Sequence, residues 1–162
     1  MLLVEKNHAS EDMIFPILKS IKELDRCYFF DRGKLLVNKG IKGDSGSYFS
    51  MSEDTCPLDI LRQLRQLALK VDPYEVDQIV INYYPVGSFI PPHTDLEGYF
   101  AFGVLVLEDS DSKFVYYEDR DLNGRKEIID EAGNFIFTDD IGLVHEVPKV
   151  TKERYSIIFL YM

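Results

Sequence analysis

The chain has 162 residues, of which 46% are hydrophobic and 13% aromatic, so it can bury the core of one folded domain. This composition excludes a disordered or low-complexity chain. The formal net charge of −10 argues against a protein that binds nucleic acid through its overall charge.

The first 75 residues predict two amphipathic helices. Ser10 is a typical N-cap, and the acidic Glu11 and Asp12 after it favour the start of a helix. Apolar residues then recur at helical spacing, at Ile14, Ile17, Leu18, Ile21 and Leu24. A second helix is predicted to start near Thr55 and Pro57 and to carry Leu58, Leu61, Leu64, Leu67 and Leu69. Both helices are expected to pack against a core.

The segment between these helices, residues 31–54, is rich in Gly, Ser, Lys and Asp, which predicts a long connection or a short hairpin. Within it, residues 31–44 are basic in an otherwise acidic protein, with Arg32, Lys34, Lys39 and Lys42. This basic segment is interpreted either as a solvated charged loop or as a lid over a substrate.

From residue 76 onward the chain becomes a series of short β-branched and aromatic segments. They predict strands at 79–84, 100–107, 114–117, 126–130, 134–138 and 154–161, with a hairpin signal at Asn123–Gly124. Because no helical pattern intervenes, the predicted fold class is α+β, with helices followed by an antiparallel sandwich or barrel. We expect a single domain over 1–162, with helical support in 1–75 and the barrel in 76–162.

Two of the three histidines lie among these strand and turn residues. His93 and Asp95 are two positions apart, so in extended backbone their side chains project to the same face. His145 could join them from a neighbouring strand. Two histidines and one carboxylate on one side of an ion form the facial triad of non-haem Fe(II) oxygenases. The His-x-Asp pair alone is a weak signal, because a sequence this rich in aspartate often contains one by chance.

Arg154 is the anomalous residue of the last predicted strand. With Ser156 it shares one face with Ile158 and Leu160, because side chains alternate along a strand. A buried guanidinium requires an anionic partner. That partner is either an acidic side chain of the protein or a bound carboxylate held bidentately.

The residues before the His93–Asp95 pair form an ordered run, Asn82-x-Tyr84-x-x-Gly87-x-x-Ile90-x-x-His93-x-Asp95. This run resembles the signature of the AlkB-like Fe(II)/2-oxoglutarate-dependent dioxygenases. His145 resembles the distal metal ligand of that superfamily, and Arg154 resembles its arginine for the remote carboxylate of 2-oxoglutarate. The resemblance covers about residues 79–162 and implies a double-stranded β-helix (jelly-roll) fold.

The resemblance also implies a role for each matching residue. His93, Asp95 and His145 would bind Fe(II), and Asn82 and Tyr84 would hydrogen-bond 2-oxoglutarate. Arg154 would pair with the distal carboxylate, and Ser156 would add a second hydrogen bond to it. The implied reaction uses O2 to hydroxylate, or oxidatively demethylate, a C–H bond with release of succinate and CO2.

The chain departs from the AlkB-like enzymes that repair nucleic acid. Those usually carry Asn two residues after the arginine and a second Arg six after it, where this chain has Ser156 and Leu160. The interval from His145 to Arg154 is nearer to that of prolyl-hydroxylase-like members. The substrate therefore remains open between a protein side chain, a small molecule and an alkylated nucleobase.

Two other classes of protein are compatible with the same residues. A cupin-like metal-binding barrel could act as a hydrolase or isomerase on the same three ligands, with zinc or manganese. A non-catalytic binding module could retain the barrel alone. The first leaves Arg154, Asn82 and Tyr84 without a role, and the second does not require an intact triad.

The expected location follows from cysteine content and hydropathy. Cys27 and Cys56 are too few for a disulfide framework and are expected to stay reduced. The first residues lack the pattern of a signal peptide, and no apolar stretch is long enough to span a bilayer. We expect a cytoplasmic monomer without a membrane partner.

Overall fold

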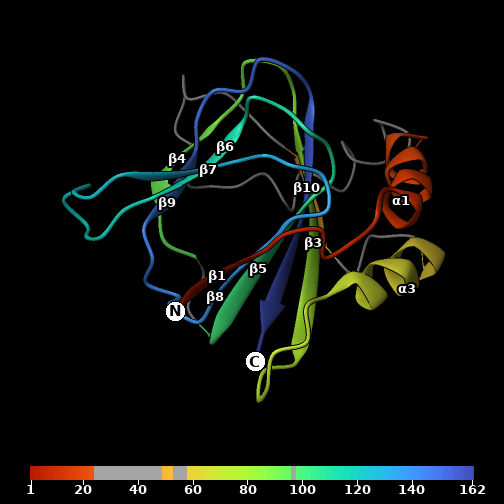
Figure 1. Cartoon of the computed structure of the whole chain (residues 1–162), viewed down its shortest axis with the longest axis horizontal. Helices are drawn as coiled ribbons and strands as arrows, with labels where there is room; N and C mark the ends of the chain where they lie inside the picture. The colour runs from red at the N-terminus through yellow and green to blue at the C-terminus, as the bar shows by residue number, and fades with distance from the viewer. Residues whose placement is uncertain (24–48, 53–57, 96–97) are drawn as a thin grey trace.

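The computed structural model describes residues 1–23, 49–52, 58–95 and 98–162 (Figure 1). The elements in chain order are β1 (Leu2–Glu5), α1 (Glu11–Glu23), β2 (Phe49–Ser52), α3 (Leu58–Leu67), β3 (Val76–Tyr84), β4 (Ile90–His93), β5 (Ala101–Val106), β6 (Lys113–Tyr116), β7 (Lys126–Ile129), β8 (Phe135–Thr138), β9 (His145–Val147) and β10 (Arg154–Tyr161). The basic 31–44 segment, both cysteines and the expected start of the second helix at Thr55 and Pro57 lie outside the described residues.

The strands form two antiparallel sheets that face each other. The larger sheet has six strands in the order β1-β8-β5-β10-β3-β2, and the smaller has four in the order β4-β9-β6-β7. Between them lies an apolar core in which Phe102, Val104 and Leu160 of the larger sheet pack with Phe114 of the smaller one. This arrangement is the double-stranded β-helix that the resemblance implies.

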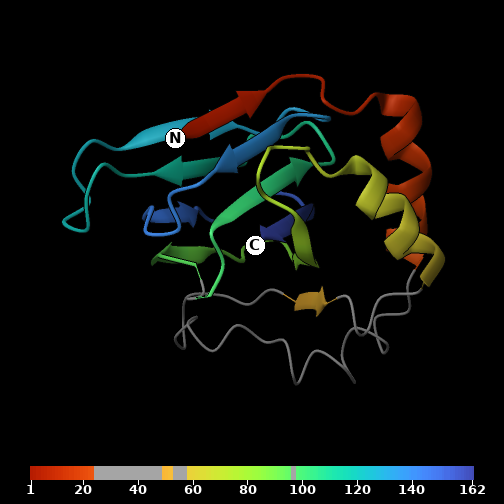
Figure 2. The same ribbon diagram turned by 90° about the horizontal axis from the view of Figure 1, so that it is seen from below.

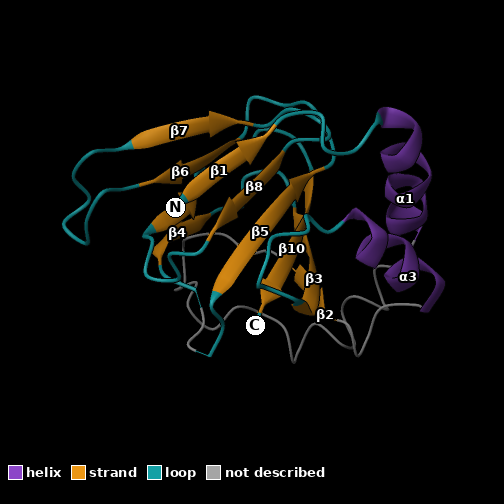
Figure 3. Cartoon of the chain, turned by 60° about the horizontal axis from the view of Figure 1, so that its bottom comes forward, coloured by secondary structure: helices purple, strands orange, loops and turns teal. Residues whose placement is uncertain are grey.

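Helices α1 and α3 cover the outer face of the larger sheet. They lie side by side at one end of the molecule (Figures 2 and 3). Their apolar stripes, which include Ile17, Ile21 and Leu64, join the same buried cluster as Ile157 and Phe159 of β10. The predicted packing of the helices against the core is confirmed. Neither of these described helices has the length and apolar character needed to cross a membrane.

Strand β10 shows the alternation that positions the site. Its odd-numbered residues, Tyr155, Ile157, Phe159 and Tyr161, belong to the core beneath the helices. Ile158 and Leu160 belong to the core between the sheets. Arg154 and Ser156 are on this second face and are buried, with 4% and 1% exposure. The predicted shared face is confirmed, and Arg154 is buried inside the barrel.

The sequence prediction missed four strands, β1, β2, β4 and β9. β1 and β2 come from the first 75 residues and pair with β8 and β3, so this region contributes strands as well as helices. The short β1 alternates between exposed and partly buried residues at a sheet edge. β4 contains Pro91 and Pro92, which cannot donate to a ladder, and its register shifts between Ile90 and His93. β9 has only three residues.

Candidate active site

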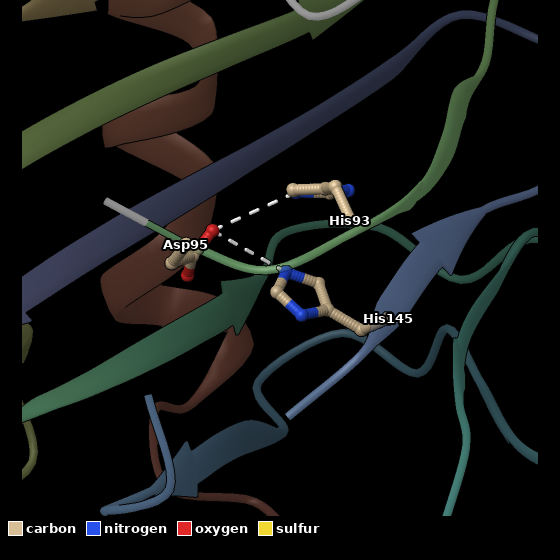
Figure 4. A group of neighbouring side chains, drawn as sticks. All are labelled: His93, Asp95 and His145. Carbon is tan, nitrogen blue, oxygen red and sulfur yellow. Dashed lines mark ion pairs between the residues drawn. The ribbon is translucent and has the colours of Figure 1, made fainter. Parts of the chain in front are cut away.

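The predicted metal ligands converge at one end of the smaller sheet. His93 is the last residue of β4 and lies directly opposite His145, the first residue of β9. Asp95 follows β4 by two residues and turns its carboxylate between the two imidazoles (Figure 4). Its Oδ1 is 3.6 Å from Nε2 of His93 and 3.4 Å from Nε2 of His145. Within the described ranges, this group has the make-up and spacing of a metal site.

Backbone carbonyls orient both imidazoles. The Nδ1–H of His93 donates to the carbonyl of Pro91 at 2.9 Å, and the Nδ1–H of His145 donates to the carbonyl of Leu143 at 2.9 Å. A carbonyl oxygen only accepts, so each Nδ1 carries a proton and each Nε2 is turned towards Asp95. Such hydrogen bonds fix the ring orientation of metal-binding histidines.

The donor set fits a divalent metal ion. Two ligands at right angles, each about 2.1 Å from an ion, are separated by about 3 Å, close to the observed spacing of Nε2 and Oδ1. Two imidazoles and one carboxylate on one side leave the opposite positions open, which is the ligand set of non-haem Fe(II) enzymes. The three side chains therefore match a divalent metal ion in spacing, and their ligand set is the one that Fe(II) takes in these enzymes.

The charges of the three groups support one another. Burial acts to raise the pKa of Asp95, but hydrogen bonds from His145 and His93 outweigh it and hold the pKa well below its usual range. Burial acts to lower the pKa of His93, yet Asp95 and the Pro91 carbonyl outweigh it and raise the pKa. Asp95 is thus an anion that favours positive charge between the imidazoles, whether from a proton or from a metal ion.

The metal end is apolar inside and open outside. The His145 ring lies 4.8 Å from the ring of Phe102 and 5.2 Å from that of Phe114, measured between centroids. On the solvent side, His93 borders a surface depression of about 400 Å³. The depression is lined by Pro92, His93, Thr94, Arg120, Leu122 and Val144. The outer side of His93 therefore faces this depression.

The four residues expected to bind 2-oxoglutarate gather in a second, buried cluster. Asn82 lies opposite Ser156, and Tyr84 lies opposite Arg154, in the β3–β10 ladder. The Tyr84 side chain is hydrogen-bonded with those of Asn82 and Ser156. Burial raises the pKa of Tyr84 against the opposing influence of Arg154, so the phenol stays protonated. The structure brings these four residues together as the resemblance implies.

Arg154 has a partner that the sequence did not identify, Asp130. Its Nε donates to Oδ2 of Asp130 at 2.7 Å and its Nη2 donates to Oδ1 at 3.3 Å. Both side chains are almost fully buried, at 4% and 2% exposure. Burial acts to lower the pKa of Arg154, but the Asp130 carboxylate outweighs it and raises the pKa. The acidic side chain, one of the two partners considered for Arg154, is therefore in place.

The metal ligands and the Arg154 cluster come from different sheets, the first from the β4–β9 pair and the second from the β3–β10 pair. His145 and His93 are opposite each other at one end, and Val147 and Ile90 are opposite each other two residues along β9. Val147 and Ile90 pack in one buried cluster with Tyr84. This cluster therefore lies between the β4–β9 pair that carries two of the metal ligands and the Tyr84 ring that contacts Arg154.

The sequence of the chain matches no protein-family model and no curated protein. Solved structures of similar fold do match. A prolyl-4-hydroxylase from Pseudomonas putida has a TM-score of 0.69 at 14% identity, covering 99% of this chain and 91% of its own. A Trichoplax adhaerens prolyl hydroxylase, solved with a hypoxia-inducible-factor peptide fragment, has a TM-score of 0.72 at 13% identity, covering 99% and 83%.

A third match, OsALKBH1, has a TM-score of 0.65 at 15% identity and covers 98% of this chain and 97% of its own. Other matches include a structure described as a member of the 2OG-Fe(II) oxygenase family and one solved with nickel and 2-oxoglutarate bound. At sequence identities of 13% to 15%, the first three matches show that the fold is similar. The chain has the double-stranded β-helix fold of the Fe(II)- and 2-oxoglutarate-dependent oxygenases.

Proposed function

We propose that the chain is an Fe(II)- and 2-oxoglutarate-dependent dioxygenase that hydroxylates, or oxidatively demethylates, a C–H bond with release of succinate and CO2. The observation that carries the proposal is the convergence of His93, Asp95 and His145, with both Nε2 atoms directed at Asp95. The fold agrees with it, as does the buried Arg154 on β10, which lies over the Tyr84 ring beside Ile90 and Val147.

Each residue has a distinct task in this proposal. His93, Asp95 and His145 would hold Fe(II), and their position on one side of the ion would leave room for the oxo acid and O2. Asn82, Tyr84, Arg154 and Ser156 would bind and orient 2-oxoglutarate. When bound, the metal and the oxo acid supply the oxidising chemistry, and the protein supplies orientation and exclusion of water. Phe102 and Phe114, packed on His145, keep the inner side of the metal end apolar.

The depression beside His93 is the proposed approach for the substrate. It presents a basic side chain, Arg120, and an apolar one, Leu122, both from the loop between β6 and β7. The proposal covers protein side chains, small molecules and alkylated nucleobases, and the net charge of −10 favours the first two. A monomeric state, a cytoplasmic location and the division into supporting and catalytic parts are included on the grounds of sequence alone.

The cupin-like hydrolase or isomerase is the second candidate, and one observation favours it. Because Asp130 already pairs with Arg154, the arginine has a structural role even in a protein that never binds 2-oxoglutarate. Such an enzyme would use the three metal ligands with zinc or manganese and would not consume O2.

The experiment that separates these candidates is succinate formation by the purified protein. We expect 2-oxoglutarate to be converted to succinate slowly without a substrate, and only when Fe(II) and O2 are both present. Replacing Fe(II) by Zn(II) is the control and should stop the reaction. Succinate formation screened against peptides, metabolites and methylated oligonucleotides then identifies the substrate. A protein that binds Fe(II) at the triad but neither binds nor converts 2-oxoglutarate would contradict the proposal.

A further inference from the structure

Asp130 is a buried carboxylate at the boundary of the two sheets. It follows β7 directly, and its backbone N–H donates to the carbonyl of Ser112 at 2.9 Å. The hydroxyl of Ser110 donates to its Oδ2 at 3.3 Å. From this position in the smaller sheet, the side chain reaches Arg154 on β10 of the larger sheet. The pair therefore links the two sheets at the end of the barrel that holds Tyr84.

The contacts of Asp130 occupy one edge of the guanidinium. Nε and Nη2 of Arg154 donate to its two oxygens, in the side-on fork typical of arginine and a carboxylate. Nη1 points elsewhere, to the hydroxyl of Ser156 at 3.3 Å. The face of the guanidinium stacks on the Tyr84 ring, with Cζ 4.9 Å from its centroid. The Nη1 end is thus the part of Arg154 that lies among the other proposed 2-oxoglutarate ligands.

The Asp130 carboxylate distinguishes this site from one in which a buried arginine has no counter-ion before the ligand binds. An arginine without a buried counter-ion would offer a full positive charge to the distal carboxylate of 2-oxoglutarate. Here Asp130 neutralises that charge before any ligand arrives, so a bound distal carboxylate would be the second anion around one cation. Two anions on different edges of one guanidinium repel each other across a low-dielectric interior.

We propose that Asp130 is the built-in counter-ion that sets the affinity of the site for 2-oxoglutarate. It stabilises Arg154 in the ligand-free protein and thereby weakens the binding of the distal carboxylate, which engages the Nη1 end beside Ser156. This inference rests on the proposed function, because it assumes that the distal carboxylate binds at Arg154. It predicts an unusual combination, in which loss of the Asp130 charge destabilises the free protein but tightens 2-oxoglutarate binding.

The test compares two oxo acids in direct binding to the Mn(II)-loaded protein. 2-Oxoglutarate carries the distal carboxylate, whereas 2-oxovalerate has the same oxo-acid end and lacks it. In the wild type we expect 2-oxoglutarate to bind more tightly in calorimetry. In Asp130→Asn, the dissociation constant of 2-oxoglutarate should fall by at least about tenfold, because the Asp130 charge no longer repels the distal carboxylate. That of 2-oxovalerate should change by less than about twofold, because it does not reach Arg154.

Asp59→Asn is the matched control, because it removes the same charge from an exposed position on α3. It should leave both dissociation constants unchanged.

Thermal unfolding gives a second readout that a merely structural role would not produce. Asp130→Asn should unfold at a lower temperature than the wild type without ligand, and 2-oxoglutarate should raise its midpoint by more than it raises the wild-type midpoint. If the variant folds poorly on its own, 2-oxoglutarate should rescue it during refolding and 2-oxovalerate should not.

The outcomes separate the two proposals. A wild type that binds both oxo acids equally well contradicts the 2-oxoglutarate site itself, and the role of Asp130 with it. A wild type that prefers 2-oxoglutarate, together with an Asp130→Asn variant whose preference is unchanged or smaller, overturns only the counter-ion role. Refolding of the variant that responds equally to both oxo acids, or to neither, overturns it as well.

Discussion

The two ends of the candidate site are built in opposite ways. At the metal end, the His93 and Asp95 side chains are 28% and 20% exposed, and Oδ1 of Asp95 lies 3.4 Å or more from each Nε2. At the arginine end, Arg154 and Asp130 are 4% and 2% exposed and are joined at 2.7 Å. The metal end faces a surface depression, whereas the arginine end is closed within the barrel.

This difference implies different modes of binding. The metal ligands are directed at a common point by the carbonyls of Pro91 and Leu143, so an ion can enter without breaking a strong contact. The arginine already has an anionic partner, so a second carboxylate binds against that partner's charge. We therefore expect changes at the metal end to abolish binding and changes at the arginine end to alter selectivity between ligands.

The largest effect is expected for His93→Ala. It removes one of three metal ligands, so Fe(II) binding and conversion of 2-oxoglutarate to succinate should fall to background. Fe(II) binding is measured as the metal content after dialysis, and conversion of 2-oxoglutarate is measured as the succinate yield. His8→Ala is the matched control, because among the described residues the His8 ring bonds the Leu67 carbonyl and packs on Phe135, away from the triad. An unchanged succinate yield in His93→Ala would contradict the assignment of the three side chains as metal ligands.

A large but selective effect is expected for Arg154. Arg154→Met alone leaves Asp130 buried without its cation, so the variant to use is Arg154→Met combined with Asp130→Asn, which removes both charges together. 2-Oxoglutarate affinity should fall by at least about tenfold, to that of 2-oxovalerate, because a charge-assisted pair is lost. Fe(II) content should match the wild type. A double variant that still prefers 2-oxoglutarate would place the distal carboxylate elsewhere.

The smallest effect is expected for Tyr84→Phe. The change removes the hydroxyl that is hydrogen-bonded with Asn82 and Ser156 but keeps the ring beneath Arg154. Loss of one of several hydrogen bonds at this end, worth about 1 kcal/mol, should weaken 2-oxoglutarate binding about fivefold. Calorimetry on the Mn(II)-loaded protein measures it, with metal affinity as the internal control. An equal loss in metal affinity would show that the two ends are not separable.

The sequence predicted the parts of the site that depend on short-range spacing. His93 and Asp95 are two residues apart, and Arg154 and Ser156 lie on one face of a long apolar strand, so local geometry places each pair correctly. The third metal ligand, His145, is far from this pair in the sequence, so the sequence predicted it only as a candidate from another strand. Its position opposite His93 is a property of the β4–β9 pairing.

The partner of Arg154 could not be predicted in the same way. Asp130 is one of 28 acidic residues, and it follows a strand of the opposite sheet, so no local spacing connects it to Arg154. The signal available in the sequence was only that a buried arginine needs an anion. β4 was missed because its two prolines argue against a strand, although the same strand carries the first metal ligand.

The most direct test of the two-ended site is a crystal structure of the protein with Mn(II) and 2-oxoglutarate. We predict that the metal is held by His93, Asp95 and His145, and that the oxo-acid end of the ligand completes its coordination. The distal carboxylate should lie within hydrogen-bonding distance of Nη1 of Arg154 and the Ser156 hydroxyl, with Asp130 still on the opposite edge. A ligand that chelates the metal but directs its distal carboxylate away from Arg154 would contradict this account.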